Sequence, residues 1–190
     1  MRAALGLALA VALILAPRPS RAEEGLKPGV LAPRFHLGTL DGKREVDSRD
    51  LFKESRATVL VLWDSYCPDC LATVKACQKF ADRVEKMGVR VVGINYDSEN
   101  LAAVRGFLKA GKIRFMNLQD RSGDVVKAYR AQAYDFSFFV IDAEGRVRSV
   151  TYDHPPEIEK ELEKAVNLGL GKESPLLPEK DGGTGCEPKS

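Results

Sequence analysis

Apolar residues gather in short continuous runs that are typical of strands buried on both faces. Residues 58–63 combine β-branched side chains with leucines and end at Trp63. Residues 89–95 and 136–142 form similar runs, and Asp41-Gly42 is a hairpin turn signal between two shorter ones. We predict strands at residues 35–37, 44–46, 58–63, 89–95, 113–118, 136–142 and 146–152.

Between these runs, apolar residues recur three and four positions apart, which favours amphipathic helices. The segment that follows Cys70 shows this spacing and ends near Gly88. Ser48 is a typical N-cap residue for a short helix, and Gly111 is a typical helix stop. We predict helices at residues 48–53, 70–87, 99–110, 124–130 and 155–168. Strands that alternate with helices indicate an α/β protein whose central mixed sheet is covered on both faces.

The two ends of the chain differ in composition from this middle. Arg2 precedes an apolar run over residues 3–16, and small residues follow at the positions that a signal peptidase reads. We therefore predict a signal peptide over residues 1–22 and an exported, periplasmic protein; an uncleaved membrane anchor is the alternative. Residues 23–170 form the predicted domain. Residues 171–190 are rich in Gly, Pro, Lys, Glu and Ser and are typical of a disordered tail.

The charge balance excludes one class of partner. The whole chain has 29 basic and 27 acidic residues, and its first 22 residues hold three arginines and no acid. The rest of the chain is therefore close to neutral, and it shows no basic stretch of the kind that binds nucleic acid. The sequence does not indicate an oligomeric state.

Cys67-Pro68-Asp69-Cys70 lies between a predicted buried strand and a predicted helix. Backbone N–H groups at a helix start favour a thiolate, and a thiolate is the species that attacks a disulfide. A bridge between two cysteines this close restrains little chain entropy, so it contributes little to folding. We interpret Cys67 and Cys70 as a catalytic redox pair, and we expect Pro68 to stiffen the turn.

These elements, in this order around this pair, resemble the thioredoxin-like fold. The chain is most similar to exported redoxins of the TlpA/ResA type, which are thiol-disulfide oxidoreductases. The resemblance covers residues 25–168 and implies a three-layer α/β/α sandwich with an N-terminal hairpin extension. The motifs that carry it are Ala32-Pro-Arg-Phe35, Leu40-Asp-Gly-Lys43, Trp63 four residues before Cys67, Val92-Gly-Ile-Asn95, Phe107, Asp120-Arg-Ser-Gly123 and Phe139-Val-Ile-Asp-Ala-Glu-Gly145.

The chain departs from that family at two places. Phe136 occupies the position where the family carries a cis-proline. Val61 occupies the position where thioredoxins place a buried acid that serves the resolving thiol, and Thr73 occupies the position where ResA-type proteins place it. The remaining candidates for that acid are Asp64, Asp69 and Asp135, and Asp135 would serve as the general base if its loop lies beside Cys70. The charge of Asp69 repels a Cys67 thiolate, which favours a reducing couple.

Other side chains have both a structural and a functional interpretation. Trp63 is first of all a core residue, and with Tyr66 and Phe136 it is a candidate for the surface that a substrate chain contacts. Cys77 is expected to be a free buried thiol, and a structural bridge from Cys77 to Cys186 is the alternative. A copper-carrying redoxin is a further alternative. Its copper site would consist of the cysteine pair and one of the two histidines, His36 or His154.

The sequence thus predicts an exported enzyme that exchanges disulfides with protein thiols, in the reductive direction. No metal or organic cofactor is implied. A redox partner, such as a membrane reductase, would regenerate the working state. The alternatives are a redoxin-fold binding protein with little turnover and the copper carrier. A peroxidase is a poor match, because Ser65-Tyr66 precedes Cys67 where peroxidases of this fold have Thr and Pro.

Overall fold

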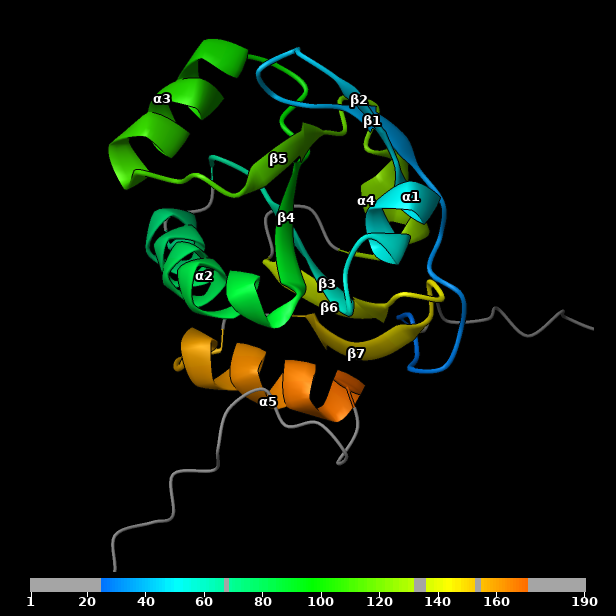
Figure 1. Ribbon diagram of the computed structural model, residues 1–190. Helices are drawn as coiled ribbons and strands as arrows, with labels where there is room; N and C mark the ends of the chain where they lie inside the picture. Colours follow the sequence, from blue (N-terminus) through cyan, green and yellow to red (C-terminus); the bar gives the residue numbers. More distant parts are fainter. Residues whose placement is uncertain (1–24, 67–68, 132–135, 153–154, 171–190) are drawn as a thin grey trace, which may run out of the picture.

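The computed structural model describes residues 25–170, apart from 67–68, 132–135 and 153–154. A five-stranded sheet in the order β5-β4-β3-β6-β7 forms the centre of the molecule (Figure 1). Strands β3, β4 and β5 are parallel to one another, whereas β6 and β7 run antiparallel to their neighbours. The strands are β3 (Ala57–Trp63), β4 (Val89–Asn95), β5 (Met116–Gln119), β6 (Ser137–Asp142) and β7 (Val147–Tyr152).

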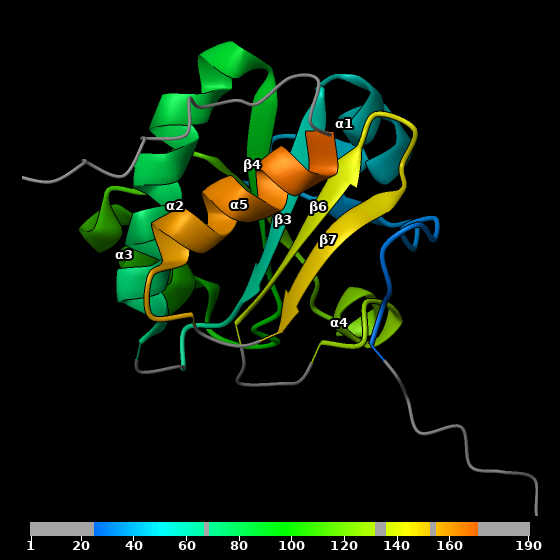
Figure 2. The ribbon, with the colours of Figure 1, turned by 90° about the horizontal axis from the view of Figure 1, so that it is seen from below.

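Helices cover both faces of this sheet, as the alternation of strands and helices predicts. On one face lie α2 (Cys70–Val84), its short 3-10 continuation η1 (Glu85–Met87), α3 (Leu101–Gly111) and α5 (Ile158–Leu170). Figure 2 shows α5 lying across β3 and β6 on this face. On the other face lie α1 (Ser48–Lys53) and α4 (Asp124–Ala128).

Strand β3 lies in the middle of the sheet, and all seven of its residues are buried. Its side chains alternate between the two faces. Val59, Val61 and Trp63 belong to the core beneath α2, α3 and α5, whereas Leu60 and Leu62 belong to the core beneath α1 and α4. The uninterrupted apolar run therefore contributes side chains to both cores. Because the strand is buried on both faces, it fixes the position of the segment that precedes Cys70.

Helices α2 and α5 are joined by charged side chains as well as by the apolar core. Arg83 of α2 forms ion pairs with Glu159 and Glu163 of α5, and Lys79 lies 3.9 Å from Glu159. These groups are partly exposed, so each pair contributes little by itself. These ion pairs lie toward the end of α2 that is farther from Cys70.

The N-terminal hairpin is formed by β1 (His36–Gly38) and β2 (Glu45–Asp47), one residue later on each side than predicted. The predicted N-cap of α1 was wrong by one position. Asp47 is the cap and accepts a hydrogen bond from the Arg49 backbone N–H at 2.8 Å. Ser48 is buried, and its hydroxyl accepts a bond from the backbone N–H of Phe35.

The predicted end of the helix over residues 99–110 also needs correction. Helix α3 begins at Leu101, after an Asn100 cap whose side chain accepts from the Ala103 N–H. Gly111 is still helical, and Lys112 adopts the left-handed conformation that ends the helix. Among the described residues, no helix is long and apolar enough to cross a membrane.

Candidate redox site

Cys70 is the first residue of α2, and its side chain is fully buried. It takes part in a disulfide bond. Asp69 occupies the N-cap position with an exposed side chain that makes no capping hydrogen bond. Cys67 and Pro68 lie outside the described residues. The structure therefore has a disulfide-bonded cysteine, Cys70, at the predicted junction between strand and helix.

The three residues after β3 form a turn that is fastened from two sides. Asp64 is only 2% exposed, and its Oδ1 accepts a hydrogen bond from the Tyr66 N–H at 2.9 Å. The Ser65 N–H donates to Oδ2 of Asp97 at 3.0 Å. Asp97 follows β4, so the carboxyl ends of two parallel strands meet at this turn. The backbone that leads to Cys67 is thus fixed by acidic side chains.

Asp97 is the most unusual polar group at this edge. It is 3% exposed, and its Oδ2 also accepts from the Asn95 side-chain amide at 2.6 Å. The same amide lies 3.3 Å from the backbone oxygen of Trp63, at the end of β3. Within the described part of the chain, Oδ1 of Asp97 has no hydrogen-bond partner. A buried carboxyl oxygen without a partner is costly, which makes Asp97 a candidate functional group at this edge.

The sequence interpretation missed Asp97 and named Asp64, Asp69 and Asp135 instead. Of these, Asp64 is a turn residue, Asp69 is exposed, and Asp135 lies outside the described residues. The sequence contained a feature that could have indicated Asp97. It lies two residues beyond β4, the parallel neighbour of the strand that precedes the cysteines.

Trp63 and Phe136 both lie in the core, which agrees with the core interpretation of Trp63 and leaves neither side chain exposed. Both are fully buried. The indole of Trp63 stacks on Phe107 with ring centroids 5.0 Å apart, and its Nε1 donates to the Asn117 side chain at 3.0 Å. Phe136 packs edge to face against Phe138. Large aromatic rings gain most from complete burial, which the face covered by α2 and α5 provides.

Tyr66 differs from these two, because 63% of its surface is exposed. It is one of four large hydrophobic residues in the described part of the chain that are clearly exposed. Its position next to Cys67 in the sequence keeps it as a candidate for contact with a substrate.

The two positions at which the resemblance to thioredoxins and ResA-type proteins implies a buried acid hold no titratable group here. Val61 lies in the apolar core. The hydroxyl of Thr73 donates to the backbone oxygen of Asp69, which ties the first turn of α2 together.

Cys77 is a free thiol on the buried face of α2. Burial raises its pKa far above the usual range for a thiol, so it stays neutral and unreactive in the folded protein. Cys186, the other half of the alternative bridge, lies outside the described residues.

His36 is an exposed residue of β1, with Nε2 3.7 Å from a Glu45 oxygen. His154 lies outside the described residues, and the described ones contain no group of three or more side chains suited to a metal ion.

A family model described as AhpC/TSA family matches residues 28–150. The chain belongs to this family. It is 26% identical over 125 residues to the thiol-disulfide oxidoreductase ResA of Bacillus thuringiensis, covering 66% of this chain and 69% of that protein. It is 27% identical over 149 residues to the thiol:disulfide interchange protein DsbE of Escherichia coli, covering 74% and 77%.

A solved structure shares this architecture. A crystal structure of a protein from Chlorobium tepidum, provisionally named DsbE, is 25% identical with a TM-score of 0.68, covering 77% of this chain and 99% of that one. The thioredoxin-like fold and the resemblance to ResA-type redoxins are therefore confirmed, and the relatives are thiol-disulfide oxidoreductases.

Proposed function

We propose that this protein is a thiol-disulfide oxidoreductase that acts on proteins through a Cys67–Cys70 pair. The observation that carries the proposal is the disulfide-bonded Cys70 at the first residue of α2. A helix start stabilises a thiolate, and the preceding strand and turn are held firmly in place. The names of the relatives describe the same chemistry.

In the reductive direction, the Cys67 thiolate attacks one sulfur of a substrate disulfide. That S–S bond breaks, the substrate's other sulfur leaves as a thiolate and takes up a proton, and a mixed disulfide forms. Cys70 then loses its proton and attacks the Cys67 sulfur, which releases the second substrate thiol. Two electrons pass to the substrate, and a Cys67–Cys70 disulfide remains. A dithiol partner must reduce it, and a membrane reductase would fit this role.

Several sequence predictions belong to the same proposal. A signal peptide over residues 1–22 would place the domain of residues 23–170, with its tail, in the periplasm. The exposed Asp69 at the helix start disfavours a thiolate at Cys67, and a reductive role follows from that. A redox titration should give a potential nearer that of thioredoxin, about −270 mV, than that of DsbA, about −120 mV. A value near −120 mV would reverse the proposed direction.

Reduction of insulin by dithiothreitol tests directly whether the protein is an enzyme. We expect the wild type to accelerate precipitation of the insulin B chain and Cys67→Ser to match the background. Cys70→Ser should accumulate a mixed disulfide, because nothing resolves it. Cys77→Ala is the matched control and should keep wild-type turnover, since Cys77 is a free thiol buried in the core.

A redoxin-fold binding protein with little turnover is the second candidate. It is favoured by the apolar Val61 and the hydrogen-bonded Thr73, which leave no acid at the two usual positions. Wild-type turnover at the background rate would support this candidate and overturn the enzyme proposal.

A further inference from the structure

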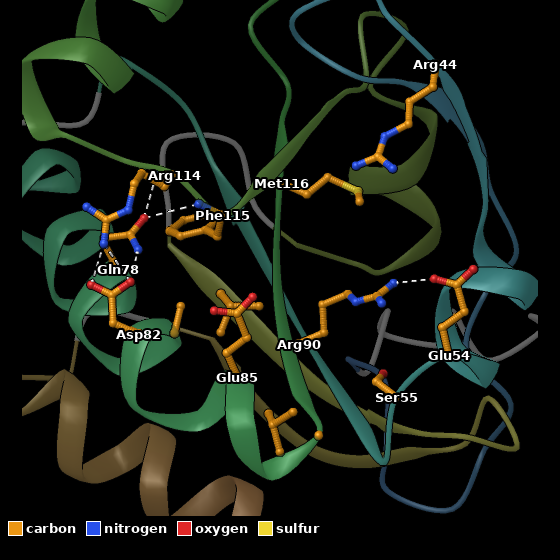
Figure 3. A pocket seen from close by; sticks show the side chains of 14 residues that line it. Arg44, Glu54, Ser55, Gln78, Asp82, Glu85, Arg90, Arg114, Phe115 and Met116 are labelled. Carbon is orange, nitrogen blue, oxygen red and sulfur yellow. Dashed lines mark hydrogen bonds and ion pairs between the residues drawn. The ribbon is translucent and has the colours of Figure 1, made fainter.

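A cavity of about 590 Å³ lies at the amino end of β4, away from the redox site. The redox site follows the carboxyl end of β3, and β3 and β4 are parallel along their whole length. The two sites therefore lie toward opposite ends of the sheet. Figure 3 shows the cavity between α2 on one side and the segments around α1 and β2 on the other.

The floor of this cavity is an unpaired strand edge. Strand β5 pairs with β4 only from Val92 onward, so the first three residues of β4 have no strand beside them on that side. The Gly88 carbonyl accepts from Arg56, next to β3, whereas the Asn95 carbonyl accepts from Asp120, next to β5. Backbone groups alternate in direction along a strand. The N–H and C=O of Val89 and the N–H of Val91 therefore face the cavity, whereas the Val91 carbonyl faces Met116, where the β4–β5 ladder begins.

The two walls differ in charge. Figure 3 shows Arg44, Arg90 and Met116 toward the α1 side. Arg90 Nη1 pairs with Glu54 at 2.6 Å, whereas no ion pair or hydrogen bond of the Arg44 guanidinium exists within the described part of the chain. This wall thus carries one uncompensated positive charge.

The opposite wall is apolar and negative. Ala81 and Phe115 pack against the core beneath α2. Arg114 donates to both carboxylate oxygens of Asp82 at 2.9 Å, and Glu85 has no cationic partner among the described residues. An acidic side chain placed on this wall would be repelled, whereas an apolar one would bury surface.

We propose that the open edge of β4 binds an extended segment of a partner protein in which acidic and apolar residues alternate. Its backbone would continue the sheet by pairing with the N–H and C=O of Val89 and with the N–H of Val91. Because side chains of a strand alternate between faces, one set would meet Arg44 and the other set would meet Ala81 and Phe115. A partner bound there would leave the redox site free, so recognition and disulfide exchange would use separate surfaces.

A synthetic eight-residue peptide of alternating valine and glutamate, titrated into the full chain and followed by NMR, tests this. We expect shifts of the backbone amides of residues 89–91 at peptide concentrations up to about 1 mM. Arg44→Ala should weaken binding about fivefold, the upper range for an exposed ion pair. Lys43→Ala, which changes the neighbouring exposed lysine outside the cavity, should bind as the wild type does. Insulin reduction should be unchanged in both variants.

Two N-methylated versions of the peptide, one for each set of alternate amides, test the strand pairing. Only the version that blocks the amides facing β4 should lose binding, by about tenfold or more. Absence of binding, equal binding of both versions, or equal binding of a lysine-for-glutamate peptide would overturn the proposal. So would a dimer in sedimentation that the peptide dissociates, because a second copy of the chain would then be the occupant.

Discussion

At the scale of single residues, Asp97 connects two strands to the turn before the cysteines. Its Oδ2 holds both the Ser65 N–H and the Asn95 amide. We expect Asp97→Ala to leave both donors unpaired and to lower the free energy of unfolding by about 2 kcal/mol. If Asp97 positions the redox segment, turnover with insulin should fall as well, and the pH dependence of Cys67 alkylation should shift.

Asp97→Asn should recover part of the turnover, because it keeps an acceptor for Ser65. Glu99→Ala, which changes an exposed acid two residues further on, is the control and should leave stability and turnover unchanged. Loss of stability in Asp97→Ala with unchanged turnover and an unchanged alkylation profile would restrict Asp97 to a structural role.

Gly93 is a second residue whose effect can be predicted. A Cβ added there would collide with the Asn117 side chain and approach Nε1 of Trp63, which are hydrogen-bonded to each other. Gly93→Ala should therefore destabilise the protein by about 2 kcal/mol in urea unfolding. Gly106→Ala on α3, where a Cβ meets nothing within 4 Å, should stabilise it by up to about 1 kcal/mol. Equal changes in stability for the two substitutions would contradict the predicted steric clash at Gly93.

At the scale of elements, helix α1 depends on the charge of its cap. Hydrogen bonds and charge from Arg49 lower the pKa of Asp47 to about 2. A carboxyl with a lowered pKa stabilises the fold above its unfolded pKa, about 3.9, and this contribution is lost as the pH falls toward 2. Asp47→Asn keeps a capping oxygen but no charge. Its Tm should be slightly below that of the wild type at pH 7, and the difference should vanish near pH 2; a difference independent of pH would refute this.

The sequence predicted the elements well where burial decided them. Strand β4 has the predicted bounds because its apolar run is continuous, and β3 differs by one residue. The ends of elements were less predictable. Ser48 and Asp47 are both good caps, and the hydrogen bond between Ser48 and Phe35, which decides between them, depends on the folded chain.

At the scale of the whole molecule, Cys77 reports on opening of the core. It lies in the core on the face covered by α2 and α5, and burial keeps its pKa above the usual range. In the reduced, folded protein, iodoacetamide at pH 8 should modify Cys77 about a thousandfold more slowly than an accessible thiol. Peptide mass mapping across a urea series should show its modification rising at the unfolding midpoint. Rapid modification without urea would contradict the buried position.

The site was less predictable than the fold. The cysteine pair follows from local spacing, whereas Asp97 reaches Ser65 only because two parallel strands end side by side. Phe136 could not be placed by sequence, because an aromatic residue at the start of a strand suits a core and a surface equally. The cavity at β4 arises from the different lengths of β4 and β5, which no motif in the sequence records.

The apolar core that α2 shares with α5, together with the ion pairs of Arg83, limits how the two oxidation states of such a pair can differ. A helix anchored along its flank does not tilt when the bond at its tip opens or closes. A partner that must tell the oxidised form from the reduced form therefore has to sense the tip itself, within a few residues of Tyr66 and Asp69. Docking elsewhere on the surface brings the two proteins together without revealing which form is bound.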